Sequence, residues 1–423
     1  MAENIFMIRS ISNFRQIDHS HKVEDFASPL HTERLSAEPI RVVRIAHSSL
    51  TPALRGRERA LARCFPNVEM EVITPPRWRE AEVEVEAEPD EYFPVRIAPT
   101  FLSKHIQLFT YDPRPIVEVF KRHKPHIIDM NHEPYSVPCA EVLTLRRLFA
   151  PQARVVMQTA QNILKKYPFP FSAMEKRAFR QISAAYMCSE TVREVLEIKG
   201  LKKPMKIAPF GVDLDLFKPA LDRIPNETFT VGYIGRLLPA KGLHVLIDSL
   251  AQIKNEKWRL LIVGDGPERA EIGNRIAVHE LQDRCKFVGA VPYDETPAYF
   301  QKIDALIIPT ITTKTIREQF GRVIVEAMAC CVPVIGSSCG AIPEVISDAG
   351  IVVPENDPAT LAQKLQKLIN DKDLQNELAK AGRARVEKHY TWEKVAEQIY
   401  SVYLEVLKNS KEYKADLSYS TQH

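Results

Sequence analysis

Short apolar runs alternate with amphipathic segments along most of this chain, and that alternation constrains the possible folds more than any other feature. In the first half, runs typical of strands (Arg41–Ala46, Ile127–Met130) alternate with segments typical of helices (Ile116–His123). The pattern restarts after a proline-bearing stretch at 209–219, beginning with Phe229–Ile234. Strands alternating with helices predict parallel sheets covered by helices. We therefore predict an α/β protein in which two Rossmann-like doubly wound domains face a central cleft.

The length of 423 residues also favours two domains, because single cores rarely grow beyond about 250–300 residues. Residues 1–39 are polar and aperiodic, which is typical of a flexible extension. We expect one Rossmann-like domain at 40–210 and another at 211–390. The amphipathic run Val395–Leu407 predicts a last helix within 391–423, followed by a tail.

Composition argues against several classes of protein. Apolar stretches stay shorter than the roughly 18 residues of a membrane-spanning helix. Near the N-terminus, Glu3 stands where a signal peptide would be basic. The seven cysteines are odd in number and form no C-x-x-C pair, which fits reduced thiols and gives no case for zinc. We therefore expect a cytoplasmic protein.

One acidic pair, Asp213 and Asp215, has the D-x-D spacing of a known metal motif. It falls in the stretch expected to link the two domains, where aspartates commonly serve turns. We therefore predict no metal, and we expect no other cofactor.

The first half of the chain carries a basic surplus. Residues 1–210 hold 31 Lys and Arg against 25 Asp and Glu, and seven of those acids lie within Glu80–Glu91. The surplus fits either an ordinary solvated surface or a face that meets an anionic acceptor or anionic lipid headgroups. Peripheral contact with a membrane is thus a candidate interaction, and we expect no nucleic-acid partner.

Two glutamates, Glu318 and Glu326, stand eight residues apart in a stretch that reads as a loop leading into a helix. The Phe320-Gly321 step predicts that the helix starts there, which puts Glu318 on the loop and Glu326 within the helix. A helix N-terminus binds anions. Carboxylates beside such a site suit a ligand that carries hydroxyl groups next to a phosphate, as a nucleotide sugar does.

Two glycine-bearing turns follow predicted strands of the second half. In the first, Gly235 allows a tight turn. Arg236 and Lys241 then supply two cations beside the start of a helix, as a diphosphate requires, although a basic surface turn would look the same. The second turn, at Gly264–Gly266, has Arg269 at the third glycine position of a dinucleotide fingerprint. We interpret it as a tight turn near the ligand.

His132 and Glu133 end a predicted strand of the first half, where the ligand-facing residues of a parallel sheet gather. A histidine at such a place is also commonly an ordinary structural residue. The residues alone leave both interpretations open.

Four motifs, taken in order, resemble those of the retaining glycosyltransferases of family 4, which have the GT-B fold. The matching stretches are Gly211–Phe217, Gly235–Gly242, Val263–Glu268 and Glu318–Ala329. Several ordered motifs are more specific than any one of them. The resemblance covers about 209–390 strongly and the first half weakly. It implies that the first domain takes the acceptor and the second takes a nucleotide-sugar donor.

The resemblance also implies a role for each matching residue. Glu326 binds the ribose hydroxyls of the donor, and Glu318 holds a hydroxyl of the transferred sugar near the reaction centre. Arg236 and Lys241 clamp the diphosphate. The glycine turns at Gly235 and Gly264 complete the donor site. So do the backbone N–H groups of Phe320, Gly321, Arg322 and Val323.

The first domain departs from the family pattern at a place that bears on catalysis. Gln161 stands where many members have a catalytic-loop histidine, and an amide does not accept a proton. Either His132 supplies that function or no side-chain base is used. We therefore assign catalysis to Glu318, Arg236, Lys241 and His132, and the acceptor side to His132, Glu133 and Gln161.

The implied activity is transfer of a hexose from a UDP- or GDP-sugar to a hydroxyl acceptor, with retention of anomeric configuration and without a metal. We expect a lipid-linked saccharide of bacterial polysaccharide or glycolipid assembly as the acceptor, at the inner face of a membrane. Three alternatives stay open: a GT-B-like nucleotide-sugar epimerase, a nucleotide-sugar-binding protein without catalysis and, on an incomplete fingerprint, an NAD-dependent enzyme.

Overall fold

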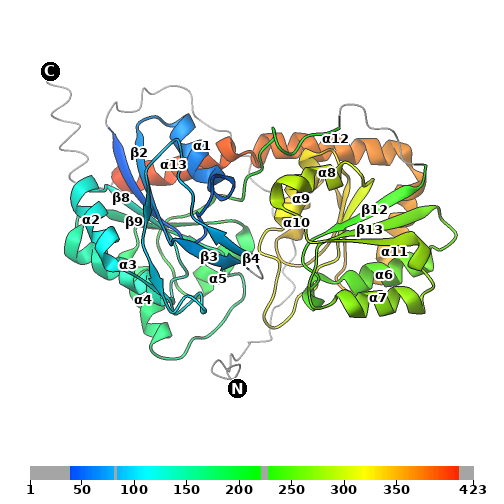
Figure 1. Ribbon diagram of the computed structural model, residues 1–423, viewed down its shortest axis with the longest axis horizontal. Helices are drawn as coiled ribbons and strands as arrows, with labels where there is room; N and C mark the ends of the chain where they lie inside the picture. Colours follow the sequence, from blue (N-terminus) through cyan, green and yellow to red (C-terminus); the bar gives the residue numbers. More distant parts are fainter. Residues whose placement is uncertain (1–38, 81–82, 221–226, 409–423) are drawn as a thin grey trace.

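The computed structural model describes residues 39–80, 83–220 and 227–408. Nearly all of the expected extension at 1–39, and the tail beyond residue 408, lie outside the described residues. Two domains lie side by side, each built on a parallel sheet, and two C-terminal helices run along both (Figure 1). The predicted α/β architecture with two Rossmann-like domains is confirmed.

The first domain is built on a seven-stranded sheet in which neighbouring strands run parallel. Strand β1 buries almost every side chain, as expected for a strand with helices on both faces of the sheet. In sheet order the strands are β11 (Met205–Ile207), β10 (Ala184–Met187), β9 (Arg154–Thr159), β8 (Ile127–Asn131), β1 (Ile40–Ile45), β2 (Val68–Thr74) and β5 (Val95–Ile97).

Helices connect these strands, and several begin at the caps that the sequence offers. The side chain of Asp112 accepts a hydrogen bond from the first turn of α2, and Ser136 does the same for α3. The helices are α1 (Gly56–Cys64), α2 (Pro113–His123), α3 (Val137–Phe149), α4 (Phe171–Gln181) and α5 (Glu190–Ile198). Two antiparallel pairs lie outside the main sheet, namely β3 (Arg77–Glu80) with β4 (Val83–Glu86) and β6 (Thr100–Phe101) with β7 (Thr110–Tyr111).

The second domain has a six-stranded parallel sheet whose strand order is the 3-2-1-4-5-6 order of dinucleotide-binding folds. Ligands of such sheets bind where the strand order reverses, which here falls between β12 and β15. In sheet order the strands are β14 (Cys285–Gly289), β13 (Trp258–Val263), β12 (Phe229–Ile234), β15 (Ala305–Ile308), β16 (Val334–Ser337) and β17 (Ile351–Val353).

The helices of the second domain follow the predicted alternation. Helix α9 begins at Arg322 with Gly321 as its N-cap, close to the start predicted from Phe320-Gly321. Strand β16 begins at Val334, two residues later than the predicted strand Val332–Ile335, because Pro333 has no N–H for the sheet. The helices are α6 (Leu243–Gln252), α7 (Arg269–Val278), α8 (Thr296–Phe300), α9 (Arg322–Ala329), α10 (Ile342–Ile346), α11 (Pro358–Asn370) and α12 (Lys372–His389).

The last helix, α13 (Trp392–Lys408), follows α12 but packs on the first domain beside α1. The hydroxyl of Tyr403 on this helix donates to Oδ2 of Asp129 at 2.6 Å, and Oδ1 of Asp129 accepts from Arg44 at 2.6 Å. All three side chains are buried. Because a buried charge must be paired, this network fixes α13 to the first sheet.

Trp392, at the start of α13, marks the junction of the domains. A Cβ on Gly56 would lie 2.4 Å from its ring, and one on Gly211 would lie 2.5 Å away. The N–H of Val212 donates to the carbonyl oxygen of Tyr390 at 2.8 Å. The chain crosses between the domains twice, near Gly211 and near Trp392, and these two segments are therefore packed against each other.

Candidate active site

Two glycine turns of the second domain pack against each other at the carboxyl edge of its sheet. Gly235 follows β12 and Gly264 follows β13. Gly264 has a φ of +132°, and a Cβ there would lie 1.9 Å from the carbonyl oxygen of Gly235. A side chain at position 264 would therefore push the two turns apart. This packing sets the course of the backbone through Arg236.

Lys241 is positioned by the glycine that follows it. It ends a short 3-10 turn, and Gly242 has a φ of +68°. A Cβ on Gly242 would lie 1.9 Å from the carbonyl oxygen of Pro309, directly beyond β15. Gly242 thus lets the chain lie against the end of β15, which brings Lys241 to the loop that carries Glu318.

Lys241 and Glu318 form an ion pair in which Nζ lies 2.6 Å from Oε2. Their side chains are 26% and 13% exposed, so both charges keep partial contact with water. Tyr233 faces the same carboxylate: burial raises the pKa of its hydroxyl, the charge of Glu318 raises it further and Arg236 opposes that shift. The structure thus links Arg236, Lys241 and Glu318, three of the four residues predicted for catalysis: Lys241 pairs with Glu318, and the charges of Glu318 and Arg236 both act on Tyr233.

The loop that carries Glu318 is fixed through its backbone. The carbonyl oxygen of Glu318 accepts a hydrogen bond from the N–H of Ala341 at 3.0 Å and another from the side-chain amide of Asn162 at 2.8 Å. Gly340 has a φ of +59°, and a Cβ there would lie 2.1 Å from the same oxygen. Because Asn162 follows β9, this contact joins the carboxyl edges of the two sheets.

Helix α9 starts directly after this loop. In the described part of the chain no side chain caps it, and its N-cap Gly321 has a φ of +81°. The first N–H groups of a helix have no partner within the helix, so those of α9 suit an anion. The guanidinium of Arg322 lies 5.0 Å from the ring centre of Tyr293 and 3.6 Å from Oε1 of Glu326.

Glu326 lies one turn further along α9 and is 7% exposed. Burial raises the pKa of its carboxyl, while the charge of Arg322 and a hydrogen bond from Tyr293 oppose that shift. The two glutamates singled out by the sequence therefore have different cationic partners, Lys241 for Glu318 and Arg322 for Glu326.

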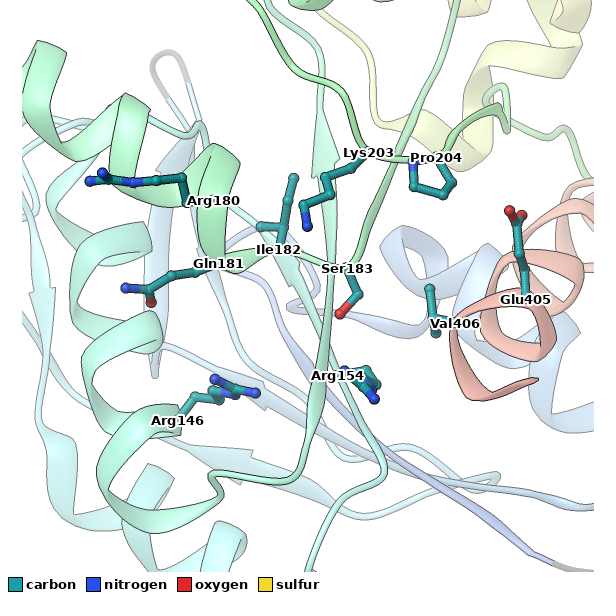
Figure 2. A pocket seen from close by; sticks show the side chains of 10 residues that line it. All are labelled: Arg146, Arg154, Arg180, Gln181, Ile182, Ser183, Lys203, Pro204, Glu405 and Val406. Carbon is teal, nitrogen blue, oxygen red and sulfur yellow. The ribbon is translucent and has the colours of Figure 1, made fainter. Parts of the chain in front are cut away.

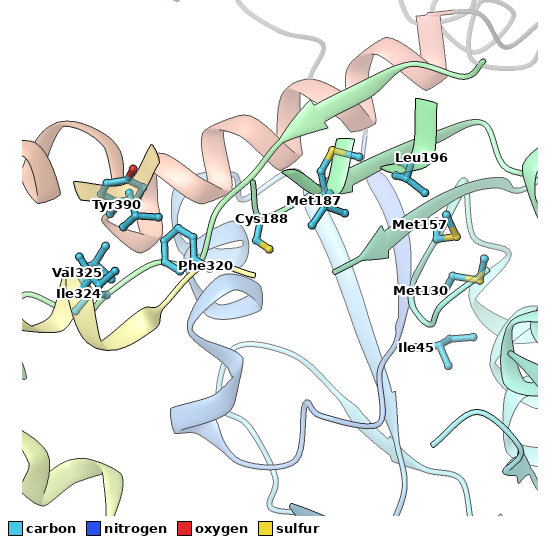
Figure 3. Packing of buried hydrophobic residues seen from close by; sticks show 14 of the residues in the cluster. Ile45, Met130, Met157, Met187, Cys188, Leu196, Phe320, Ile324, Val325 and Tyr390 are labelled. Atoms are coloured by element: carbon cyan, nitrogen blue, oxygen red, sulfur yellow. The ribbon is translucent and has the colours of Figure 1, made fainter. Parts of the chain in front are cut away.

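The side chain of Phe320 belongs to the packing between the domains. It is 3% exposed, and its ring centre lies 5.6 Å from that of Phe210 and 5.7 Å from that of Tyr390. Figure 3 shows Phe320 between Tyr390 and Cys188, whose thiol donates to the carbonyl oxygen of Gln319 at 3.4 Å. The backbone N–H is therefore the group of Phe320 that suits a ligand, as the family resemblance implies.

His132, the fourth residue predicted for catalysis, is buried at the end of β8 and is 4% exposed. Its ring is stacked with that of His47 at 5.6 Å between centres, and Nε2 lies 3.3 Å from the hydroxyl of Tyr111. Burial lowers the pKa of His132 well below its ordinary range, and the charges of His47 and Arg44 lower it further. A ring with so low a pKa is a weak base near pH 7, so these surroundings favour the structural interpretation.

Glu133 and Gln161 shape the loop that follows β9. Glu133 accepts hydrogen bonds from the hydroxyl of Thr159 at 2.6 Å and from the N–H of Ala160 at 3.0 Å. Gln161 accepts one from the backbone two residues further on, at 3.0 Å. Their side chains thus serve the loop that carries Asn162, and their roles towards an acceptor stay predictions.

Asn162 is a candidate that the sequence did not indicate. It is 1% exposed, and its Oδ1 is buried without a hydrogen-bond partner among the described residues, whereas its Nδ2 binds the backbone of Glu318. Such an oxygen can accept a hydrogen bond from a ligand hydroxyl. The available signal was its position three residues after β9 and next to Gln161.

Within the described ranges, no group of three or more His, Cys, Asp or Glu could hold a metal ion, and the expected absence of a metal stays a prediction. Asp213 serves a turn, because its Oδ1 accepts hydrogen bonds from the N–H groups of Asp215 at 2.9 Å and Leu216 at 3.2 Å. None of the helices described is both long and apolar enough to span a membrane.

Comparison with known proteins adds independent observations. One family model, described as Glycosyl transferases group 1, matches residues 218–385, and another, described as Glycosyltransferase Family 4, matches residues 58–216. A phosphatidylinositol N-acetylglucosaminyltransferase component from Arabidopsis thaliana is 25% identical over 310 residues, which are 71% of this chain and 66% of that one. The capsular polysaccharide biosynthesis glycosyltransferase CapM from Staphylococcus aureus is 26% identical over 70% of this chain and 81% of its own.

The structure of Anabaena HepE in complex with UDP aligns with 86% of this chain and 100% of its own, with a TM-score of 0.68 and 18% identity. Two Rossmann-like domains arranged in this way define the GT-B fold of glycosyltransferases. With both family models matched, the chain belongs to the glycosyltransferases of group 1, in family 4, as its motifs suggested.

Proposed function

We propose that this chain is a retaining hexosyltransferase that moves a hexose from a nucleotide-diphosphate sugar to a hydroxyl acceptor. The ion pair of Lys241 with Glu318 supports this proposal best. It lies at the carboxyl edge of a Rossmann-like sheet and beside the N-terminus of α9. A cation, a carboxylate and helix N–H groups meet there, and together they suit the phosphate and hydroxyl groups of such a donor.

In this proposal the diphosphate lies against Arg236, Lys241 and the first N–H groups of α9. The donor phosphate shares Lys241 with Glu318, and the carboxylate of Glu318 accepts a hydrogen bond from a hydroxyl of the hexose. Glu326 accepts hydrogen bonds from the ribose. The burial of Glu326 suits this task, because little water competes with the ribose hydroxyls for hydrogen bonds to its carboxylate.

Charge stabilisation supplies the rate enhancement in this proposal. As the bond from the anomeric carbon to the diphosphate oxygen breaks, negative charge grows on the diphosphate and positive charge grows on the sugar ring. Arg236 and Lys241 stabilise the negative charge on the diphosphate where it develops. Loss of one such fixed contact costs about 3 kcal/mol, which is roughly a hundredfold in rate.

The acceptor proton passes to the departing diphosphate oxygen, so that no side-chain base is needed. The acceptor oxygen then attacks on the face from which the diphosphate leaves, and the anomeric configuration is retained. The buried, weakly basic ring of His132 supports this route over a histidine base. Asn162 supplies its Oδ1 to orient the acceptor hydroxyl.

We propose a lipid-linked saccharide of polysaccharide or glycolipid assembly as the acceptor. The Arabidopsis relative is named for phosphatidylinositol, and the Staphylococcus relative is named for capsular polysaccharide. The Anabaena structure contains UDP, which makes UDP-sugars the first donors to try.

A thermal-shift panel of UDP- and GDP-sugars tests the proposal, because a ligand that binds the folded state raises Tm by mass action. The stabilising donor is then incubated with and without acceptor saccharides, and the products are read by NMR. A glycoside with the donor's anomeric configuration supports the proposal. An epimerised sugar formed without acceptor identifies an epimerase instead, and an inverted glycoside contradicts retention.

A further inference from the structure

A strongly basic pocket lies in the first domain, away from the candidate active site (Figure 2). Its volume of about 290 Å³ is close to the lower end of the ~300–1,000 Å³ typical of small-molecule sites. Residues at the ends of α3 and α4, residues before or at the starts of β9, β10 and β11, and α13 line it.

The pocket is remote from the candidate active site. Arg154 is the first residue of β9, and Lys203 precedes β11, so the pocket lies at the amino edge of the first sheet. Asn162 and the contacts to Glu318 lie beyond Thr159, at the carboxyl edge. At about 3.3 Å per residue, β9 separates the two edges by roughly 17 Å. A small occupant of the pocket therefore does not reach the donor loops.

Positive charge dominates the lining. Four cations, Arg146, Arg154, Arg180 and Lys203, face one acid, Glu405. In Figure 2, Arg146, Arg154 and Lys203 gather around the middle of the view, and Arg180 points away. Burial lowers the pKa of the Arg146 guanidinium, and the neighbouring charge of Arg154 lowers it further. Like charges held together in a partly buried site attract an anion.

Gln181 adds a requirement of the opposite kind. Its Oε1 is buried without a hydrogen-bond partner in the described part of the chain, and it can only accept a hydrogen bond. A phosphate group near neutral pH carries a charge of about −1.5 to −2 and three acceptor oxygens, which suit the cations. In Figure 2 Gln181 points the same way as Arg180, away from Lys203 and Arg154, so a hydroxyl beside the phosphate, rather than the phosphate itself, suits its Oε1.

We propose that this pocket is a binding site for a phosphate-bearing anion, separate from the donor site. Arg146, Arg154 and Lys203 bind the phosphoryl oxygens through charge-assisted hydrogen bonds. Gln181 accepts from a hydroxyl elsewhere on the ligand. Glu405 weakens binding by repulsion and comes from α13, the helix that leads from the second domain onto the first.

Isothermal titration of inorganic pyrophosphate into the full chain tests the site, with the Lys241→Ala background used to weaken binding at the donor site. Pyrophosphate should bind in that background. Lys203→Ala should weaken binding at least tenfold, and its exposed neighbour Lys202→Ala should leave it unchanged. Glu405→Gln should strengthen binding about threefold. The proposal is overturned if pyrophosphate fails to bind, or if Lys203→Ala and Lys202→Ala behave alike.

The phosphate can belong to a soluble compound or to a lipid headgroup, and vesicles separate these sources. Leu148, 64% exposed two residues beyond Arg146, would enter the apolar part of a bilayer. If the ligand is a lipid, phosphatidic acid vesicles should bind more tightly than phosphatidylcholine vesicles, and Leu148→Ser should weaken vesicle binding without changing pyrophosphate binding. Equal binding to both vesicles, with Lys203-dependent pyrophosphate binding, identifies a soluble ligand. The site would be refuted if Lys203→Ala changed neither the affinity for vesicles nor the affinity for pyrophosphate.

Discussion

The Nζ atom of Lys241 lies 2.6 Å from Oε2 of Glu318, although 77 residues separate them in the sequence. Lys241 comes after β12 and Glu318 after β15, and these neighbouring strands form the switch point of the second sheet. Asn162 reaches the same loop from the first domain. One ion pair thus joins the loop of the proposed diphosphate site to the loop on which the two domains meet.

Glu326→Gln should weaken binding of the donor nucleotide about tenfold. A hydrogen bond to a charged group contributes about 1.5–3 kcal/mol, and the amide keeps the shape without the charge. Isothermal titration gives the dissociation constants. A 2′,3′-dideoxy nucleotide is the matched control, because wild type and variant should bind it equally. A tenfold difference that persists with this analogue would mean that Glu326 does not read the ribose.

Asn162→Ala should lower kcat about tenfold while changing the affinity for the nucleotide by less than threefold. The reason is that Asn162 belongs to the first domain, whereas the groups proposed to bind the nucleotide belong to the second. Initial rates and titration measure the two quantities. Lys166→Ala, an exposed change in the same loop, serves as control. Equal losses in kcat and nucleotide affinity would contradict the separation of roles.

Tyr403→Phe should lower the free energy of unfolding by about 1–3 kcal/mol, since it removes a donor from the buried carboxylate of Asp129. Tyr400→Phe on the same helix is the matched control. Its hydroxyl accepts a hydrogen bond from the side-chain amide of Asn67 at 3.0 Å, and because this partly buried bond joins two neutral groups, its loss should cost about 1 kcal/mol or less. Urea denaturation measures the free energy of unfolding of both variants. A larger decrease in Tyr400→Phe than in Tyr403→Phe would contradict this prediction.

Glu344 should make the protein less stable as pH rises from about 4.5 to about 7. Burial raises the pKa of its carboxyl from 4.5 to about 7, and the charge of Glu190 on the first domain adds to the shift. The folded state then binds the proton more tightly than the unfolded chain, so this contribution is complete below pH 4.5 and is lost as pH passes 7.

Denaturation at pH 5 and pH 8 checks the effect of Glu344. Glu344→Gln cannot titrate, yet its side-chain oxygen can still accept the hydrogen bond from the N–H of Glu190. The free energy of unfolding of wild type should therefore fall more between the two pH values than that of the variant. Equal falls would show that Glu344 does not carry this dependence.

The sequence predicted the fold well because buried parallel strands are short apolar runs that periodicity detects. The start of α9 was also predictable, since Gly321 and the apolar residues after it are local signals. Helix α4 was missed because it buries only Ala178 and Phe179, and charged residues make up much of its sequence. Its aromatic start, within Lys165–Phe171, reads equally well as a loop.

Contacts between distant segments were beyond the reach of the sequence. His47 and His132 are stacked because β1 and β8 are neighbours in the sheet, and no local pattern encodes that pairing. The bond from Asn162 to Glu318 spans 156 residues and both domains. The ion pair of Lys241 and Glu318 was predicted only as two residues of one site, while its geometry comes from Gly242 packing against Pro309.

The most direct test of the central claim is the affinity of the full chain for UDP and GDP, measured by titration for wild type and Lys241→Ala. We predict that wild type binds one of the two nucleotides and that Lys241→Ala weakens this binding by about tenfold to a hundredfold, because one charge-assisted contact to the diphosphate is lost. Lys254→Ala, an exposed control in the same domain, should bind as wild type does. Binding of neither nucleotide, or unchanged binding by Lys241→Ala, would contradict the proposed donor site.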